Sequence, residues 1–451
     1  MPFDEVLDGS LNNAVKLIQT GRFTPLELVD AAIARVEADP IARKYFNRFE
    51  SEDASKRAAK LTSKDVRQRK ASLAGIPLAQ KDLFADRGRV ITFGAHPAFH
   101  RRSSGTADAL RLLQSAGAIN LGGLHMSEFA MGGGGWSSFF GFVSHPFDSS
   151  RVSGGSSSGS AAAVARKILF GALGTDTGGS LRVPSSFCGV VALKPSNGRI
   201  STRGVFPVSH TLDTVGPVAR SVADCATLFE VLAGARGRKS NKGVRPNFDK
   251  LRFGFLAVDS LPSPPDSNVS EAYSSLKKNL GNSKLLTEEV PSSQFAELNA
   301  MSGIVFLSEA GAVHANRLRA PEILIGPQVA DRLLQGLTFP ASIYLRAINA
   351  KKSLHARFQK EIFSKVDILL LPTTPCSAPL MKEYNAMSTS DALKFNGRFG
   401  TYTAAFNYLG LPVLSMPMHR RGLPVGIQVV GDIGCDELVL KAAGIIEKHI
   451  S

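Results

Sequence analysis

Two glycine- and serine-rich segments of the chain carry the residue types that acyl transfer needs. One spans residues 153–160 and the other spans residues 174–182. Such tracts often serve as flexible linkers, but a linker lies between polar stretches, whereas each of these segments directly adjoins an apolar run. We therefore expect both to be ordered loops that present serine hydroxyl groups beside a packed core.

One serine chemistry is suggested by Gly155, Ser157 and Gly159, which match the G-x-S-x-G nucleophile elbow of α/β-hydrolases. That elbow directly follows a strand and needs an aspartate and a histidine later in the chain. Residues 146–151, which precede the match, are turn-like, and the later histidines lie in no recognisable catalytic context. The pattern therefore favours a different serine chemistry.

The order of the motifs resembles the signature region of the amidase signature hydrolases. The stretches that carry the resemblance are GGSSSGSAAAVA from residue 154, GTDTGGSLRVPSSFCGVVALKPSNGRIS from residue 174 and LDTVGPVARSVAD from residue 212. Upstream, GIPLAQKD at residues 75–82 is similar to the lysine-bearing strand of that family. The resemblance implies hydrolysis of a C–N acyl bond through an acyl-enzyme, with no metal and no organic cofactor.

Carried over by position, the resemblance makes Ser180 the nucleophile, Ser156 a bridging serine held by a cis peptide bond, and Lys81 the base. The physical chemistry of these residue types agrees with those roles. A serine hydroxyl needs an adjacent base, and a lysine can serve as that base only when its amine is neutral. Burial disfavours the charged amine, and Lys81 lies between apolar residues on both sides.

A turn next to the expected nucleophile could stabilise the oxyanion of the intermediate. Its consecutive backbone N–H groups are suitable donors, and its two glycines allow close approach of a substrate. The turn consists of Thr177, Gly178, Gly179 and Ser180. Asp176 and Arg182 flank it, and we expect them to form an ion pair that holds the loop.

The elements that must position these residues alternate between strand and helix periods. Thr24 and Pro25 predict the start of a helix that ends near Asp39, and from residue 75 onward short apolar runs alternate with glycine-rich turns and helical stretches. This alternation predicts an α/β fold, a single large domain with a mixed central sheet covered by helices on both faces. Within one domain over residues 1–451 we expect an N-terminal helical segment (1–70), a catalytic signature core (70–232), a linker (234–250), a variable substrate-side helical region (265–365) and a C-terminal return to the sheet (366–451).

Charge and cysteine content limit the partners. The 53 lysines and arginines exceed the 38 acidic residues by 15, but the basic residues are scattered. We therefore expect a basic surface and a small-molecule substrate, with no nucleic acid and no membrane, and a homodimer as the default assembly. The four cysteines show no CxxC spacing, and the N-terminus has no signal-peptide pattern, which favours reduced thiols in the cytoplasm and no metal site.

The substrate prediction rests on apolar segments that we expect to line the site. The proposed contacts are Met131, Gly132, Gly133, Trp136, Tyr344 and Tyr402. Together they favour a free-standing amidase for apolar or aryl carboxamides, and also for carbamates (urethanes), because a carbamate presents the same carbonyl to the same nucleophile.

Two alternatives to that function remain open. Residues 126–132 are close to a segment in the A subunit of the glutamine amidotransferases that modify tRNA. On our alignment, however, those proteins have an acid for the glutamine amine where this chain has Gly400 or Thr401, and an arginine for the carboxylate where it has Lys351. A non-catalytic binding module on the same scaffold is disfavoured because all three catalytic positions are present.

Overall fold

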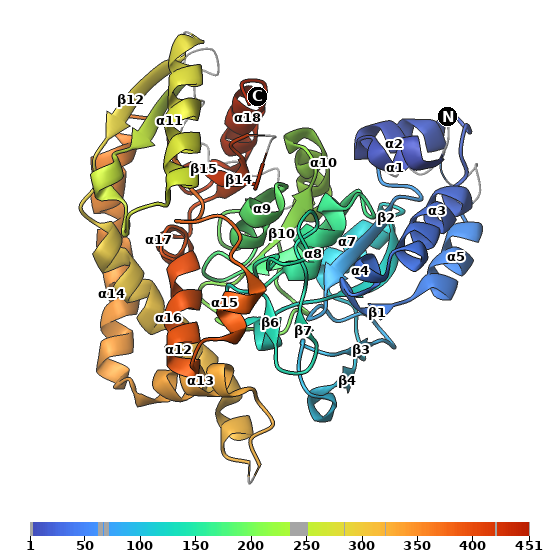
Figure 1. Cartoon of the computed structure of the whole chain (residues 1–451), viewed down its shortest axis with the longest axis horizontal. Coiled ribbons are helices and arrows are strands. Elements are labelled where there is room, and N and C mark those ends of the chain that lie inside the picture. The colour runs from blue at the N-terminus through green and yellow to red at the C-terminus, as the bar shows by residue number, and fades with distance from the viewer. Residues whose placement is uncertain are drawn as a thin grey trace.

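The N-terminal helices begin where the sequence provides caps. Helix α3 (Pro25–Ala38) starts with a capping box, in which the Thr24 hydroxyl accepts from the Glu27 amide at 3.2 Å and the Glu27 carboxylate accepts from the Thr24 amide at 2.8 Å. Its apolar positions are buried, as the helical spacing predicts. The neighbouring helices are α1 (Phe3–Asp8), α2 (Leu11–Gln19), α4 (Pro40–Arg43) and α5 (Ser51–Ala59). These helices form one end of the molecule in Figure 1.

The centre of the molecule is a large mixed sheet. The computed structural model describes residues 3–61, 66, 72–234, 251–283, 285–320, 322–419 and 422–450, which include an 11-stranded sheet. In spatial order its strands are β1 (Phe46–Phe49), β5 (Ile119–Leu124), β2 (Pro77–Lys81), β8 (Gly171–Asp176), β10 (Thr214–Ala219), β9 (Val191–Lys194), β14 (Val413–Pro417), β15 (Gly426–Val430), β13 (Ile368–Pro372), β11 (Arg252–Leu256) and β12 (Leu286–Val290).

Helices lie on both sides of this sheet (Figure 1), as the predicted fold class requires. Along the signature region they are α7 (Asp108–Ser115), α8 (Ser158–Ala165), α9 (Arg182–Cys188) and α10 (Val222–Ala233), with α18 (Asp436–Glu447) packed on α10. The later helices are α11 (Ser267–Asn282), α12 (Phe295–Leu318), α13 (Pro327–Thr338), α14 (Ala341–Phe358), α15 (Met381–Asn385), α16 (Thr389–Phe399) and α17 (Ala404–Leu409). Helix α12 packs against α13, α14 and α17 and forms a helical wall beside the sheet.

Strand direction explains how residues far apart in the chain reach one site. Strands β2 and β8 are parallel neighbours, so their carboxyl ends, at Lys81 and Asp176, point to the same edge of the sheet. Helix α8 begins at Ser158, directly after the first serine-rich loop, and it packs on both β2 and β8. The fold therefore brings both serine-rich segments to the end of the lysine-bearing strand.

The sheet extends beyond the strands that the sequence predicted. Strands β11 and β12 add a parallel pair at one edge, next to β13. Glu288 and Glu289 lie on the outermost strand, where charged side chains discourage pairing with another chain. Residues 235–250 of the predicted linker lie outside the described residues. Among those that are described, no helix is long and apolar enough to cross a membrane.

Candidate active site

Lys81 is completely buried at the end of β2. Its Nζ atom lies 2.6 Å from the Ser156 Oγ atom and 2.9 Å from the Thr175 Oγ1 atom. Burial lowers the pKa of Lys81 to about 7, although the nearby carboxylates of Asp213 and Asp176 oppose the shift. A large fraction of this amine is therefore neutral near pH 7.

Ser156 sits in a crowded stretch of backbone. The Gly155–Ser156 peptide bond is cis, as the resemblance implies, and the Ser156 carbonyl accepts from the Ser127 amide at 3.1 Å. The Gly155 amide donates to the Gly133 carbonyl at 2.7 Å, and a Cβ atom on Gly155 would lie only 2.5 Å from the Ser127 hydroxyl. Glycine is required at 155 because neighbouring chain segments approach so closely. The glycine run at 132–135 is one of these packed segments.

Ser180 lies on the turn between β8 and α9. Its carbonyl accepts from the Ser157 amide at 3.1 Å, which joins the two serine-rich segments. Ser180, Gly178 and Gly179 line a cavity of about 250 Å³ together with Gly155. The expected nucleophile is therefore open to a ligand, whereas Ser156 is fully buried.

The four residues expected to form the oxyanion hole are not equivalent. The Gly179 amide donates to the Asp176 Oδ1 atom at 2.7 Å, so this N–H group is already engaged. The Thr177 hydroxyl donates to the Asp213 Oδ1 atom at 2.6 Å, which fixes the other side of the turn. Gly178, Gly179 and Ser180 line the cavity and Thr177 does not, so the amides of Gly178 and Ser180 are the candidate donors to an oxyanion in this conformation.

Asp176 and Arg182 form the ion pair that the sequence predicted. Both side chains are fully buried, and the Arg182 guanidinium donates to the two carboxylate oxygens at 3.0 Å each. Burial alone would raise the pKa of Asp176, but the charge and hydrogen bonds of Arg182 hold it well below its usual value. Arg182 also donates to Gln428 at 2.8 Å and to Asn407, so strand β15 and helix α17 support the turn.

The predicted substrate contacts divide into two groups. Gly132 and Gly133 line the cavity that contains Ser180, and Met131 and Trp136 line a smaller cavity next to it. The other two lie away from both cavities. Tyr344 donates to Glu309 at 2.8 Å, and Tyr402 is buried in the core with its hydroxyl donating to the Ser263 carbonyl.

The opposite side of the Ser180 cavity is formed by residues that the sequence did not single out. Arg332 on α13 and Asn299 on α12 both line it, with Phe306 beneath the guanidinium at 5.2 Å from the ring centre. The sequence alignment places the carboxylate-binding arginine of the amidotransferase A subunits at Lys351. In the structure Lys351 lies near Glu309 and does not line this cavity. Thr401 and Gly400 do line it, at the position expected from that alignment.

The comparisons with known proteins agree with this fold and site. The family model described as Amidase matches residues 27–440, so the chain belongs to the amidase family, and its fold and motifs are those of an amidase signature serine hydrolase. A solved structure described as an amidase is 34% identical in sequence and superposes with a TM-score of 0.87. The match covers 98% of this chain and 100% of the chain of that structure. An enzyme of s-triazine catabolism is 28% identical, with a TM-score of 0.86 and 98% of each chain covered. The chain is therefore an enzyme that acts on C–N bonds.

The curated relatives correct the predicted substrate and partners. The A subunit of the glutamyl-tRNA(Gln) amidotransferase from Agathobacter rectalis is 33% identical over 96% of this chain and 92% of its own length. The corresponding protein of Lachnospira eligens is 32% identical, with 97% of each covered. The prediction of a free-standing amidase for apolar or aryl amides and carbamates is therefore wrong, and so is the prediction of a small-molecule substrate without nucleic acid. The prediction gives weight to a missing acid at Gly400 or Thr401 and a missing arginine at Lys351, whereas the structure places another arginine, Arg332, in the lining of the cavity.

Proposed function

We propose that this chain is the A subunit of an amidotransferase and releases ammonia from the side-chain amide of glutamine for transfer to a tRNA-linked amino acid. The observation that carries the proposal is a guanidinium without a carboxylate partner in the same cavity as Ser180. The full-length similarity to the A subunits of glutamyl-tRNA(Gln) amidotransferases supports the acceptor and the existence of partner subunits.

Arg332 supports recognition of a carboxylate. Among the described residues no acidic side chain pairs with it, and burial lowers its pKa, which marks a cation held partly out of water. A half-buried guanidinium is stabilised by a carboxylate that it can bind through two parallel hydrogen bonds. The α-carboxylate of glutamine has that geometry, and apolar or aryl amides lack such a group.

Asn299 supports recognition of the amine. Its Nδ2 group donates to the Thr401 carbonyl at 2.8 Å, while its Oδ1 atom is buried without a hydrogen-bond partner. An unsatisfied buried acceptor is costly, and an ammonium group is a strong donor to it. Asn299 thus replaces the acid that is absent at Gly400 and Thr401.

The proposed catalytic steps use the Lys81–Ser156 contact and the exposed Ser180, with Ser156 as the relay between the base and the nucleophile. Ser180 Oγ bonds to the amide carbon while its proton passes to Ser156 Oγ and the Ser156 proton passes to the neutral Lys81 amine. When the intermediate collapses, the C–N bond breaks and the protons return along the same path to the departing nitrogen, which leaves as ammonia. Water then cleaves the acyl-enzyme to give glutamate and free Ser180. The amides of Gly178 and Ser180 stabilise each oxyanion.

The proposed assembly acts in the cytoplasm, where aminoacyl-tRNA is used. The net charge of +15 suits a complex that contains RNA, since positive surface charge attracts phosphate groups. The four cysteines are all free thiols, in keeping with a reducing compartment.

The proposal is tested by measuring ammonia release from glutamine, from asparagine and from an aryl amide by the purified chain, with and without partner subunits. We expect glutamine to be preferred, and Ser180→Ala to abolish release from every substrate while the far-ultraviolet circular dichroism is unchanged. Ser353→Ala, which removes an exposed hydroxyl on α14, is the matched control. Preference for the aryl amide, or full activity of Ser180→Ala, would contradict the proposal.

A further inference from the structure

A second cavity of about 470 Å³ lies beside the small hairpin formed by β3 (Val90–Ile91) and β4 (Arg101–Arg102). Its lining includes the arginine and hydroxyl residues Arg101, Arg102, Ser104 and Thr106 and the apolar residues Leu83 and Phe206. It shares no lining residue with the cavity that contains Ser180. It is therefore a separate concave site, and neither the family nor the catalytic chemistry accounts for it.

Two positive charges lie near this cavity: Arg101 lines it, and Arg317, which does not, lies over the ring of Phe206, which does. The Arg101 guanidinium lies 6.0 Å from the centre of the Phe93 ring, and the Arg317 guanidinium lies 5.4 Å from that of Phe206. The centres of these two rings are only 4.7 Å apart. Burial and the charge of Arg101 both lower the pKa of Arg317, which is the expected effect of a like charge nearby.

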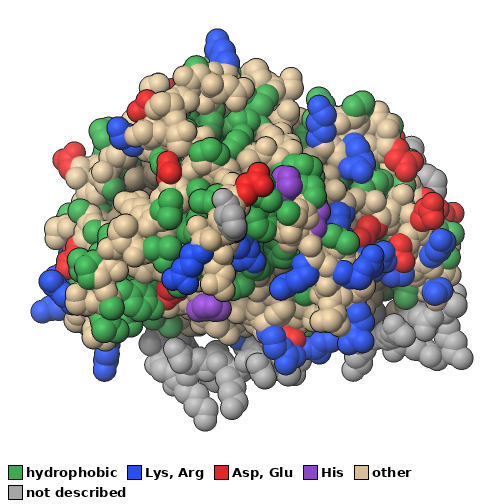
Figure 2. Space-filling view, turned by 90° about the horizontal axis from the view of Figure 1, so that it is seen from below, with side chains coloured by type: hydrophobic (Ala, Val, Ile, Leu, Met, Phe, Trp, Pro, Cys, Tyr) green, Lys and Arg blue, Asp and Glu red, His purple; other side chains and the backbone are tan. Residues whose placement is uncertain are grey.

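Neither guanidinium is neutralised within the described part of the chain. Arg101 forms no ion pair there. Arg317 donates to the Val313 carbonyl of its own helix at 3.3 Å and lies over the rings of Phe99, Phe129 and Phe206, but it has no acidic partner among the described residues. Nearby arginines differ, because Arg203 pairs with Asp108 at 2.8 Å. Figure 2, a view from the hairpin end of Figure 1, shows many lysine and arginine side chains on this face, with acidic side chains among them. Two close cations without an acid favour the binding of an external anion.

We propose that this cavity binds a nucleotide, with Arg101 holding its phosphate, the nearby charge of Arg317 adding to the attraction, and Leu83 and Phe206 contacting its base. Guanidinium groups match phosphate oxygens in geometry, and two of them balance a doubly charged group. The volume is in the range of small-molecule sites and is too large for a bare ion. The nucleotide is either a free mononucleotide or the terminal nucleotide of an RNA, which present the same phosphate and base.

The first experiment measures binding to the full chain by calorimetry, with AMP, inorganic phosphate, adenosine and a short single-stranded RNA that carries a terminal phosphate. We expect AMP to bind with one site per chain, and phosphate and adenosine to bind at least tenfold more weakly. Binding of the RNA without binding of AMP would show that the site takes the terminal nucleotide of an RNA, and this result would also support the proposal. Failure of every phosphate-bearing probe to bind would overturn it.

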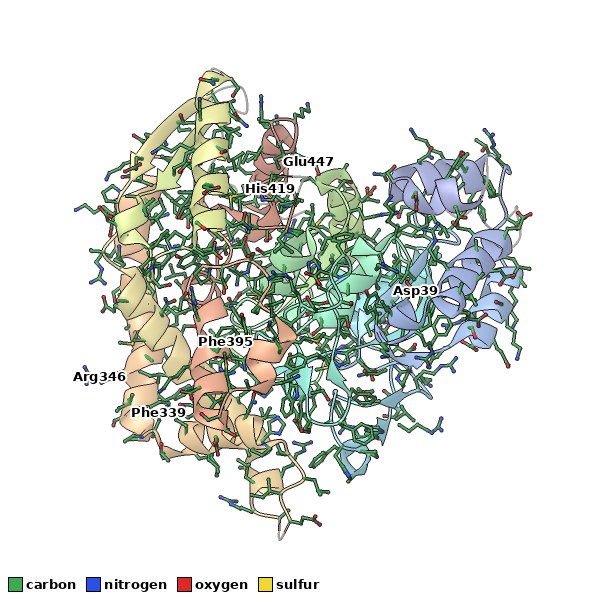
Figure 3. The ribbon with its side chains drawn as sticks, viewed as in Figure 1. Asp39, Phe339, Arg346, Phe395, His419 and Glu447 are labelled. Carbon is green, nitrogen blue, oxygen red and sulfur yellow. The ribbon has the colours of Figure 1, made fainter. Side chains whose placement is uncertain are left out.

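The second experiment uses variants. Arg101→Gln should weaken AMP binding at least tenfold without loss of stability, because Arg101 is exposed. Arg317→Gln should weaken it by a smaller factor, because Arg317 does not line the cavity. Arg346→Gln is the matched control, since Arg346 is exposed on α14 and points outward at the far side of the molecule (Figure 3). AMP binding that is equal in Arg101→Gln and in the unaltered chain would overturn the proposal.

Discussion

Two regions beside the Ser180 cavity differ in how completely their polar groups are paired. One is the set of buried residues around the nucleophile loop, Lys81, Asp176 and Arg182, which we call the floor. The other is the helical wall, to which Arg332 and Asn299 belong. On the floor, Lys81, Asp176 and Arg182 are fully buried, and each is hydrogen-bonded to neighbouring side chains. On the wall, Arg332 has no carboxylate partner among the described residues, and the Asn299 Oδ1 atom has no hydrogen-bond partner. The two regions therefore have different roles.

A region with internally satisfied groups keeps its geometry whether or not a ligand is bound. A region with unsatisfied groups gains stability only when a ligand supplies the complementary groups. The floor thus holds the reacting groups in place, whereas the wall selects the molecule that reaches them. Each of the following predictions tests one side of this difference.

The largest effect is expected from removing the base. Lys81→Met should lower kcat/KM for glutamine by ~10³-fold, a typical value for general base catalysis, with little change in KM. Burial lowers the pKa of Lys81 to about 7, and only the neutral amine accepts a proton. In the unaltered enzyme kcat/KM should therefore fall tenfold for each pH unit below about 7 and level off above about pH 7. Steady-state rates between pH 5.5 and 9 check both points.

Lys194 provides a matched control for that experiment. Lys194 is as buried as Lys81, and its pKa is also lowered to about 7, first by burial and then by the charge of Arg182. Its Nζ atom, however, donates to the Pro195 carbonyl at 2.8 Å, and among the described residues no hydrogen bond joins it to a serine. Lys194→Met should therefore keep the pH dependence below 7. Loss of that dependence in Lys194→Met would show that the wrong lysine had been assigned.

The floor was largely predictable from the sequence. Its residues occur in contiguous motifs, where Asp176 and Arg182 lie six positions apart and Lys81 ends an apolar strand. Parallel strands place their carboxyl ends at one edge, so position in the motif indicates position in space. The engagement of the Gly179 amide by Asp176 was not predictable, because it depends on the exact path of the turn.

The wall was not predictable in the same way. Arg332 and Asn299 lie on amphipathic helices where charged and amide residues are common on exposed faces, and no motif distinguishes them. Tyr344 and Tyr402 are predicted as substrate contacts because aromatic residues often line pockets, but aromatic residues are equally common in the core. Only the packing of α12 and α13 over the sheet decides which side chains reach the cavity.

The next largest effect concerns stability of the floor. Asp176→Asn should lower the free energy of unfolding by about 3–5 kcal/mol, because it leaves the buried Arg182 guanidinium without a counter-charge. Asp367→Asn is the control, since its pair with Arg252, at the same 3.0 Å, is partly exposed and should contribute about 0–1 kcal/mol. Urea unfolding of both variants measures the difference. Equal losses would contradict the distinction between a buried and an exposed pair.

The smallest effect is expected on the wall, and it appears in KM. Arg332→Met should raise KM for glutamine about 10–100-fold with kcat nearly unchanged, because a hydrogen bond to a charged group is worth about 1.5–3 kcal/mol and is made equally in the ground and transition states. Lys351→Met is the control, because the sequence alignment placed the carboxylate contact there while the structure places Lys351 outside the cavity. If Lys351→Met raised KM and Arg332→Met did not, the alignment would be right and the wall would not bind the substrate through Arg332. A fall in kcat with unchanged KM in Arg332→Met would instead assign Arg332 to the reacting groups, and the division between floor and wall would fail.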